Sequence, residues 1–138
     1  MKLVLDADVL IGALDGSDPH HEAARGLFTS WHEDGTPLLV SVVNLTEVLV
    51  APAAERKRLR TARQAIAALG VAVHRPSEAI GVDAAGLRAR HPISLPDAYC
   101  LATAKHTAGS VVSFDRKVVR AAEAERIEFV AVTPRRRR

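Results

Sequence analysis

The chain has 138 residues, of which 48% are hydrophobic and 25% charged, and its formal net charge at neutral pH is +3. This length and composition fit one folded domain and exclude a disordered chain or two independent cores. The apolar runs are interrupted well before the roughly 20 residues that a membrane-spanning helix needs, and Asp6 and Asp8 disrupt any signal peptide, so we expect a cytoplasmic protein without membrane contact.

Apolar runs with strand character alternate with helical patterns along the whole chain. The expected strands are residues 2–6, 38–40, 71–74 and 111–114, with a fifth candidate at 129–132. The expected helices are residues 9–14, 20–31, 55–69, 77–90, 94–104 and 116–125, and one more that carries Glu47 and ends before Pro52. The expected N-caps of the first three helices are Asp8, Asp18, and Ser41 or Asn44. The alternation predicts an α/β fold, a three-layer α/β/α sandwich around a central, mainly parallel sheet of four to five strands.

Four acidic residues accompany these strands and helices. Asp6 and Asp115 end two expected strands, and the carboxyl ends of parallel strands form the edge where ligands bind. Glu47 and Asp97 are expected on first helical turns at that same edge. Crowded carboxylates need a cation to offset their repulsion, and an all-oxygen set favours Mg²⁺, for which Mn²⁺ can substitute. The sequence therefore predicts a metal site whose activated water hydrolyses phosphodiesters.

Each acid also has a purely structural interpretation. Asp8 and Asp115 stand where helix N-caps are expected. Two pairs have the spacing of capping boxes, Asn44 with Glu47 and Ser94 with Asp97. Capping explains any one of these residues, but it gives no reason for acids to fall beside apolar strands that themselves end in acids. The group as a whole therefore favours the metal site.

Residues 1–133 are expected to form a single domain, followed by a basic tail at 134–138. Four of the 19 basic residues are the terminal arginines, and the chain has 16 acidic residues, so the rest carries a net charge of −1. Any nucleic-acid surface on the domain must therefore be local. The RNA-binding candidates beside the acids are Arg88, Arg90, His91, Arg116 and Lys117. The arginine cluster of residues 56–63 is interpreted as a solvated or partner-facing helix surface, and the tail as a contact for RNA or a partner.

Four short motifs occur in a familiar order: LDADVL at Asp6, NLTEVL at Glu47, LPDAYCLATA at Asp97 and SFD at Asp115. Together they resemble the PIN domains of VapC toxins over nearly the whole chain. The resemblance implies that these four acids bind the metal, Asp6 and Asp97 most directly, and that Ser113 supports the site. Many relatives carry Asn or Ser at the position of Asp8, which is here either an outer ligand or a helix cap.

The resemblance also implies a function and partners. VapC-like toxins are Mg²⁺-dependent endoribonucleases of type II toxin–antitoxin systems with the three-layer fold expected above. They form homodimers and are inhibited by a cognate VapB-like antitoxin, so RNA, an antitoxin and a second copy are the expected partners. The sequence leaves open which RNA is cut and where.

Two other functions remain open at the level of sequence. DADVL after an apolar strand resembles the nucleophile loop of haloacid-dehalogenase-type phosphatases, with Asp6 attacking and Asp8 as acid/base, although that leaves Glu47 and Asp97 unexplained. A non-catalytic partner-binding module is the third interpretation. The six histidines lack zinc-site spacing, and the single Cys100 is expected to be a small buried hydrophobe.

Overall fold

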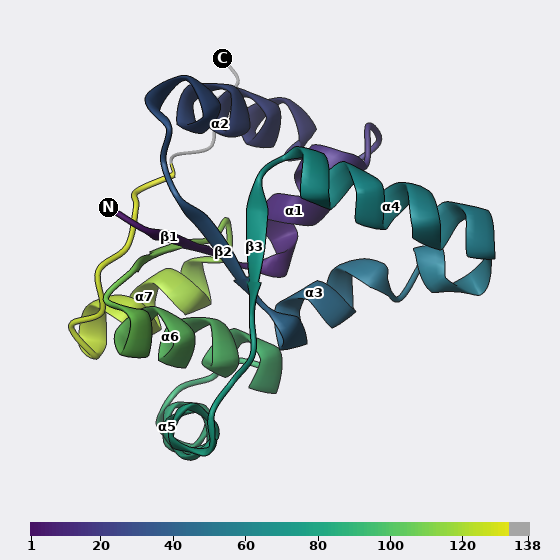
Figure 1. Cartoon of the computed structure of the whole chain (residues 1–138). Helices are drawn as coiled ribbons and strands as arrows, with labels where there is room; N and C mark the ends of the chain where they lie inside the picture. Colours follow the sequence, from purple (N-terminus) through teal and green to yellow (C-terminus); the bar gives the residue numbers. More distant parts are fainter. Residues whose placement is uncertain (133–138) are drawn as a thin grey trace.

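The computed structural model describes residues 1–132, and its alternating strands and helices can be followed in Figure 1. The strands are β1 (Leu3–Leu5), β2 (Leu38–Ser41), β3 (Val71–His74) and β4 (Ser110–Val112). The helices are α1 (Ala7–Leu14), α2 (His21–Asp34), α3 (Val42–Leu49), α4 (Arg56–Ala68), α5 (Glu78–Arg90), α6 (Leu95–Thr107) and α7 (Arg116–Ala124), with a short 3₁₀ turn, η1 (Pro52–Ala54). The predicted α/β alternation is confirmed.

The four strands form one sheet in the order β3-β2-β1-β4, and all neighbouring pairs are parallel. Leu3 of β1 is in register with Leu38 of β2 and with Ser110 of β4. All four strands therefore end at the same edge of the sheet. Ligands of parallel α/β proteins bind outside that edge.

Two apolar cores cover the two faces of the sheet, as the alternation of side chains along β1 requires. Leu3 and Leu5 pack with residues of α1, α2 and α4, whereas Val4 packs with residues of α5, α6 and α7. Each fully buried leucine or valine contributes roughly 1.5–3 kcal/mol through loss of apolar surface to water. Cys100 is fully buried in the second core, as expected. The predicted three-layer sandwich is confirmed (Figure 1).

The last strand is shorter than predicted because its end bonds to the acids and not to a neighbouring strand. β4 ends at Val112, whereas the sequence predicted a strand through Phe114. Ser113 donates its hydroxyl hydrogen to Asp6, and the N–H of Phe114 donates to the carboxylate of Asp8. These bonds turn the chain out of the sheet at the edge where the strands end.

Two predicted N-caps, Asp8 and Asp18, were wrong, and of the two candidates for the helix that carries Glu47, Ser41 is confirmed. α1 begins at Ala7 with Asp6 as its N-cap, so Asp8 lies inside the first turn. The carboxylate of Asp18 accepts from His20 N–H at 2.8 Å, which places Asp18 in the turn before α2. α3 starts directly after β2 with Ser41 as its cap, so Asn44 is an interior helical residue and forms no capping box. The prediction of Glu47 on the first turn was also wrong, because this early start places Glu47 on the second turn.

The predicted fifth strand is a single parallel bridge between Val111 and Phe129. Val111 N–H donates to Glu128 O at 2.8 Å and Val130 N–H donates to Val111 O at 2.9 Å, and the pairing extends no further. No helix within residues 1–132 is both long and apolar enough to cross a membrane. The basic tail predicted at 134–138 lies outside the described residues.

Candidate metal centre

The predicted acids lie at the edge where the strands end. Asp6 directly follows β1, Asp115 follows β4 by three residues, and Glu47 lies on α3, which begins at the end of β2 in Figure 1. Electrostatic effects show which carboxyls are neighbours: Asp97 raises the pKa of both Asp6 and Glu47, and Asp115 raises the pKa of Asp8. The fold therefore brings residues from four separate segments together.

Asp6 is the most deeply buried of these acids, with 4% of its surface exposed. Its Oδ1 accepts from Ala7 N–H at 2.8 Å, and its Oδ2 accepts from the hydroxyl of Ser113 at 2.7 Å. Burial, followed by repulsion from Asp8, raises the pKa of Asp6 to about 8. A carboxyl in this environment becomes a stable anion at neutral pH when a cation lies beside it.

Asp8 is connected to the loop after β4. Its Oδ2 accepts from Phe114 N–H at 2.9 Å and lies 3.4 Å from the Ser113 hydroxyl, while its buried Oδ1 has no hydrogen-bond partner among the described residues. Burial raises the pKa of Asp8 to about 6, against the hydrogen bond from Phe114, which lowers it. Since Asp8 is not a helix cap, the outer-ligand interpretation of this residue stays a prediction.

Asp97 combines a structural role with a free oxygen. Its Oδ2 accepts from Ser94 N–H at 3.1 Å, and Ser94 Oγ accepts from Asp97 N–H at 3.2 Å, which completes the predicted capping box at the start of α6. Within residues 1–132 its Oδ1 accepts no hydrogen bond. Capping of α6 therefore leaves one carboxylate oxygen of Asp97 available to a metal.

Glu47 is held near Asp97 by Asn44, a role that the sequence analysis did not predict. Asn44 is fully buried, and its side-chain amide donates to Glu47 Oε1 at 3.3 Å and to Pro96 O at 3.1 Å. It thereby joins α3 to the first turn of α6, next to Asp97. The signal in the sequence was a polar residue three positions before Glu47, which we interpreted as a cap.

Replacing Asn44 by Ala should destabilise the protein by about 2 kcal/mol, because a fully buried side chain and its hydrogen bonds to Glu47 and Pro96 are lost. It should also free Glu47 from its fixed position and so weaken metal binding. Thermal unfolding and Mg²⁺ titration would measure both effects. Thr46→Ala, an exposed change on the same helix, is the matched control, and equal behaviour of the two variants would contradict the linking role of Asn44.

Asp115 caps α7 through a 2.9 Å hydrogen bond from Lys117 N–H to its Oδ1, as the structural interpretation predicted, and its N–H donates to Ser113 Oγ. Ser113 therefore contacts both Asp6 and Asp115. Among residues 1–132, no three His, Cys, Asp or Glu side chains already form a metal-binding group. The acids are neighbours along the edge, but their carboxylates do not converge on one metal position.

Three observations fit a divalent cation at this edge. The candidate ligands are all carboxylates, which suit a hard ion such as Mg²⁺. The Oδ1 of Asp8 is buried and unpaired, a costly state that a cation or its bound water relieves. Asp6 and Asp8 both have raised pKa values because burial and their neighbours disfavour the anions. The donor set therefore matches the predicted metal.

The candidate RNA-binding residues differ in their availability. Arg88, Arg116 and Lys117 are exposed, and no ion pair holds them within residues 1–132. Arg90 instead makes a two-pronged ion pair with Glu125, at 2.7 and 3.2 Å, and His91 Nε2 lies 2.8 Å from the same carboxylate. These contacts lower the pKa of Glu125 to about 2. These contacts connect the C-terminal end of α5 to the C-terminal end of α7.

Because Arg90 is already paired, Arg90→Gln should change the KM for RNA less than twofold and should lower the melting temperature slightly. Arg88→Gln on the same helix is the matched comparison, since Arg88 has no such partner. Steady-state cleavage kinetics and a thermal melt would measure both variants. A large rise in KM for Arg90→Gln alone would show that this guanidinium leaves Glu125 to bind RNA.

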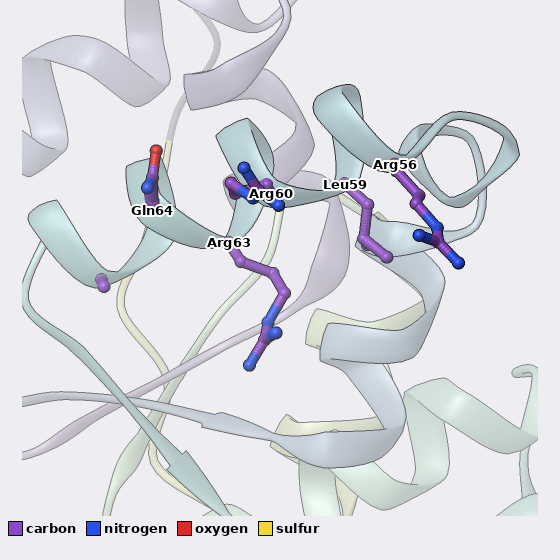
Figure 2. A pocket seen from close by; sticks show the side chains of 6 residues that line it. Arg56, Leu59, Arg60, Arg63 and Gln64 are labelled. Atoms are coloured by element: carbon purple, nitrogen blue, oxygen red, sulfur yellow. The ribbon is translucent and has the colours of Figure 1, made fainter.

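The arginine cluster lies on the outer surface of α4. Figure 2 shows Arg56, Arg60 and Arg63 on successive turns, beside Leu59 and Gln64. These residues line a shallow depression of about 450 Å³ formed by α4 alone. This placement agrees with the interpretation of the cluster as a solvated or partner-facing surface.

Comparison with known proteins gives the same fold. A family model described as "PIN domain" matches residues 3–124. A toxin–antitoxin complex from Klebsiella pneumoniae aligns at a TM-score of 0.72 and 22% identity, over 95% of this chain and 98% of that one. VapC20 of Mycobacterium tuberculosis, titled a "Sarcin-Ricin loop cleaving toxin", gives 0.72 and 17%, over 86% and 94%. VapBC2 from Rickettsia felis, bound to a promoter DNA fragment, gives 0.73 and 12%, over 94% and 98%.

No curated protein matches the sequence. At these identities the solved structures establish the fold, and that fold is the one predicted from the motifs around Asp6, Glu47, Asp97 and Asp115. The family model covers most of the chain and includes all four acids. The chain belongs to the PIN-domain family.

Proposed function

We propose that this PIN domain is a Mg²⁺-dependent endoribonuclease and the toxin of a type II toxin–antitoxin system. The observation that carries the proposal is the group of mutually repelling carboxyls at the sheet edge, from Asp6, Asp8, Asp97 and Glu47. The fold is shared with toxins of such systems, one of which is described as a "Sarcin-Ricin loop cleaving toxin".

Asp6, Glu47, Asp97 and Asp115 would hold the metal, with Asp8 as an outer ligand. When bound, Mg²⁺ or Mn²⁺ supplies an activated water and offsets negative charge on the phosphodiester. Ser113 donates to Asp6 and accepts from Asp115 N–H, so it fixes the spacing of these two acids. The capping box of Asp97 and the amide of Asn44 fix the other side of the site. This rigid support is what positions ligands for catalysis.

The phosphatase alternative leaves Glu47 and Asp97 without a role, although the electrostatic influence of Asp97 on Asp6 and Glu47 makes all three neighbours at the sheet edge. The chain also matches the PIN-domain model from residue 3 to residue 124. A non-catalytic module remains testable in the same assay as the nuclease.

The test is cleavage of total tRNA and rRNA by the purified protein with Mg²⁺, with cuts mapped by end-labelling. EDTA and the Asp97→Asn variant are the controls, because Asn retains capping ability at the start of α6 and removes the charge. We expect discrete cuts that are absent from both controls. Hydrolysis of a small phosphomonoester without RNA cleavage would support the phosphatase, and absence of Mg²⁺ binding would support a binding module.

The toxin role predicts a homodimer and inhibition by a VapB-like antitoxin. Light scattering would measure the mass of the purified protein, and co-expression with a VapB-like antitoxin would test whether growth arrest is relieved. Arrest by the unmodified chain and none by Asp97→Asn would link toxicity to the acids. Growth that is unaffected by the unmodified chain would contradict the toxin role and leave the nuclease activity to be judged by the RNA assay.

A further inference from the structure

A pocket separate from the depression on α4 lies beside the carboxylates at the sheet edge. It has a volume of about 280 Å³ and lies between the end of β4, α7 and the segment after the last helix. Ser113, which donates to Asp6, forms part of its wall. The pocket thus shares the residue Ser113 with the candidate metal centre. Its size is near the lower end of small-ligand sites, about 300 Å³.

The pocket has two aromatic walls. Phe114 and Phe129 both line it and both are half-buried. His20 stacks on the ring of Phe114 from outside the pocket, with ring centroids 4.3 Å apart and planes 11° from parallel. Phe129 packs against the core beneath α7. Both rings are therefore held in place before any ligand arrives, as an aromatic stacking site requires.

Two arginines complete the pocket. Arg116 and Arg120 line it from α7, and they are four positions apart in the sequence, so their side chains lie one above the other on the same helix face. Both are exposed, and neither forms an ion pair within residues 1–132. Unpaired guanidinium groups beside a carboxylate edge are suited to an anionic ligand that extends from the pocket to the metal.

We propose that this pocket binds one unpaired nucleotide of the RNA, next to the phosphodiester that is cut. The base stacks on Phe114 and Phe129, and its phosphate contacts Arg116 and Arg120. A base that is stacked inside a duplex cannot also stack on Phe114 and Phe129, so the substrate is cut in a loop or single strand. The inference rests on the proposed ribonuclease activity, and it assigns base stacking to Phe114 and Phe129 and phosphate binding to Arg116 and Arg120.

The experiment measures binding separately from cleavage. A fluorescein-labelled 10-nucleotide single-stranded RNA is titrated by anisotropy into the Asp97→Asn chain with Mg²⁺, at several salt concentrations. In this background Phe114→Leu should weaken binding about tenfold, through loss of base stacking. Arg120→Gln should weaken binding severalfold and make the salt dependence shallower by about 0.7 in the log–log slope. Arg25→Gln, an exposed arginine on α2, is the matched control and should change neither.

In the otherwise unmodified chain, Arg120→Gln should raise KM and leave kcat nearly unchanged, and Phe114→Leu should alter the base found beside the mapped cuts. Wild-type affinity and wild-type cut sites in both variants would overturn the inference while the nuclease assay still stands. A change of the dimer to a monomer, without an effect on RNA binding, would assign the pocket to a protein interface and would also overturn it. RNA binding that depends on these residues, without any cleavage, would uphold the pocket and refute the proposed activity.

Discussion

Replacing Asp6 by Asn should reduce Mg²⁺-dependent RNA cleavage by roughly 1,000-fold and, at the same time, make the metal-free protein more stable. Activity falls because the most buried of the candidate ligands loses its charge. Stability rises because burial and the charges of Asp8 and Asp97 disfavour the Asp6 anion, and a neutral amide removes that repulsion. Opposite effects on activity and stability distinguish a functional acid from a structural one.

The amide suits the hydrogen bonds of this position. Its oxygen can accept from Ala7 N–H, as Asp6 does now, and its NH₂ group can donate to Ser113 Oγ. Asp34→Asn, a change of an exposed acid at the end of α2, is the matched control and should alter neither property. Cleavage kinetics and thermal unfolding in EDTA would measure the two effects. If Asp6→Asn lost both activity and stability, Asp6 would be mainly a helix cap of α1.

The alternation of strands and helices could be predicted because it depends on local patterns. The run at Leu3–Leu5 is apolar at every position since both faces of β1 are covered, and the sequence shows this directly. The strand order β3-β2-β1-β4 could not be read from the sequence, because it depends on which apolar faces fit together after the helices form. The general rule for parallel sheets was nevertheless enough to place the acids at one edge.

The positions of individual caps were less predictable. Asp6 and Asp8 are two residues apart, and either has the side chain of an N-cap, so the choice depends on where β1 ends. The N–H of Asp6 makes the last ladder bond of β1, to Val112 O of β4, which lies 106 residues away in the chain, so the helix starts directly after Asp6 and Asp6 is its cap. Long-range contacts of this kind decide helix starts, and a single sequence does not contain them.

The capping and metal-binding interpretations were treated as alternatives in the sequence, but the structure makes them compatible. Asp97 closes the capping box of α6 with one oxygen and keeps the other free, and Asp115 caps α7 with its Oδ1. A carboxylate has two oxygens with several acceptor sites, so one can orient the side chain while the other binds a ligand. In this fold the helix caps position the candidate metal ligands.

The stability of the metal-free protein should fall as the pH rises from about 5 to about 8. The pKa of Asp6 is raised to about 8 and that of Asp8 to about 6, from an ordinary value of 3.8. Between 3.8 and these values the folded state keeps protons that the unfolded state has lost, so folding is favoured at low pH and this contribution disappears as the pH passes the raised pKa values. For Asp6 the loss over this range is on the order of 3 kcal/mol.

Mg²⁺ should reverse this trend, because a bound cation stabilises the carboxylate anions and competes with their protons. The increase in melting temperature on adding Mg²⁺ should therefore be larger at pH 8 than at pH 5, by up to about 10 °C for a chain of this size. Calorimetry with EDTA and with Mg²⁺ at both pH values measures this, and the Asp6→Asn variant should lose most of the difference. An equal effect of Mg²⁺ at both pH values would mean that the ion binds elsewhere, since only ligands with raised pKa values couple metal binding to protons in this range.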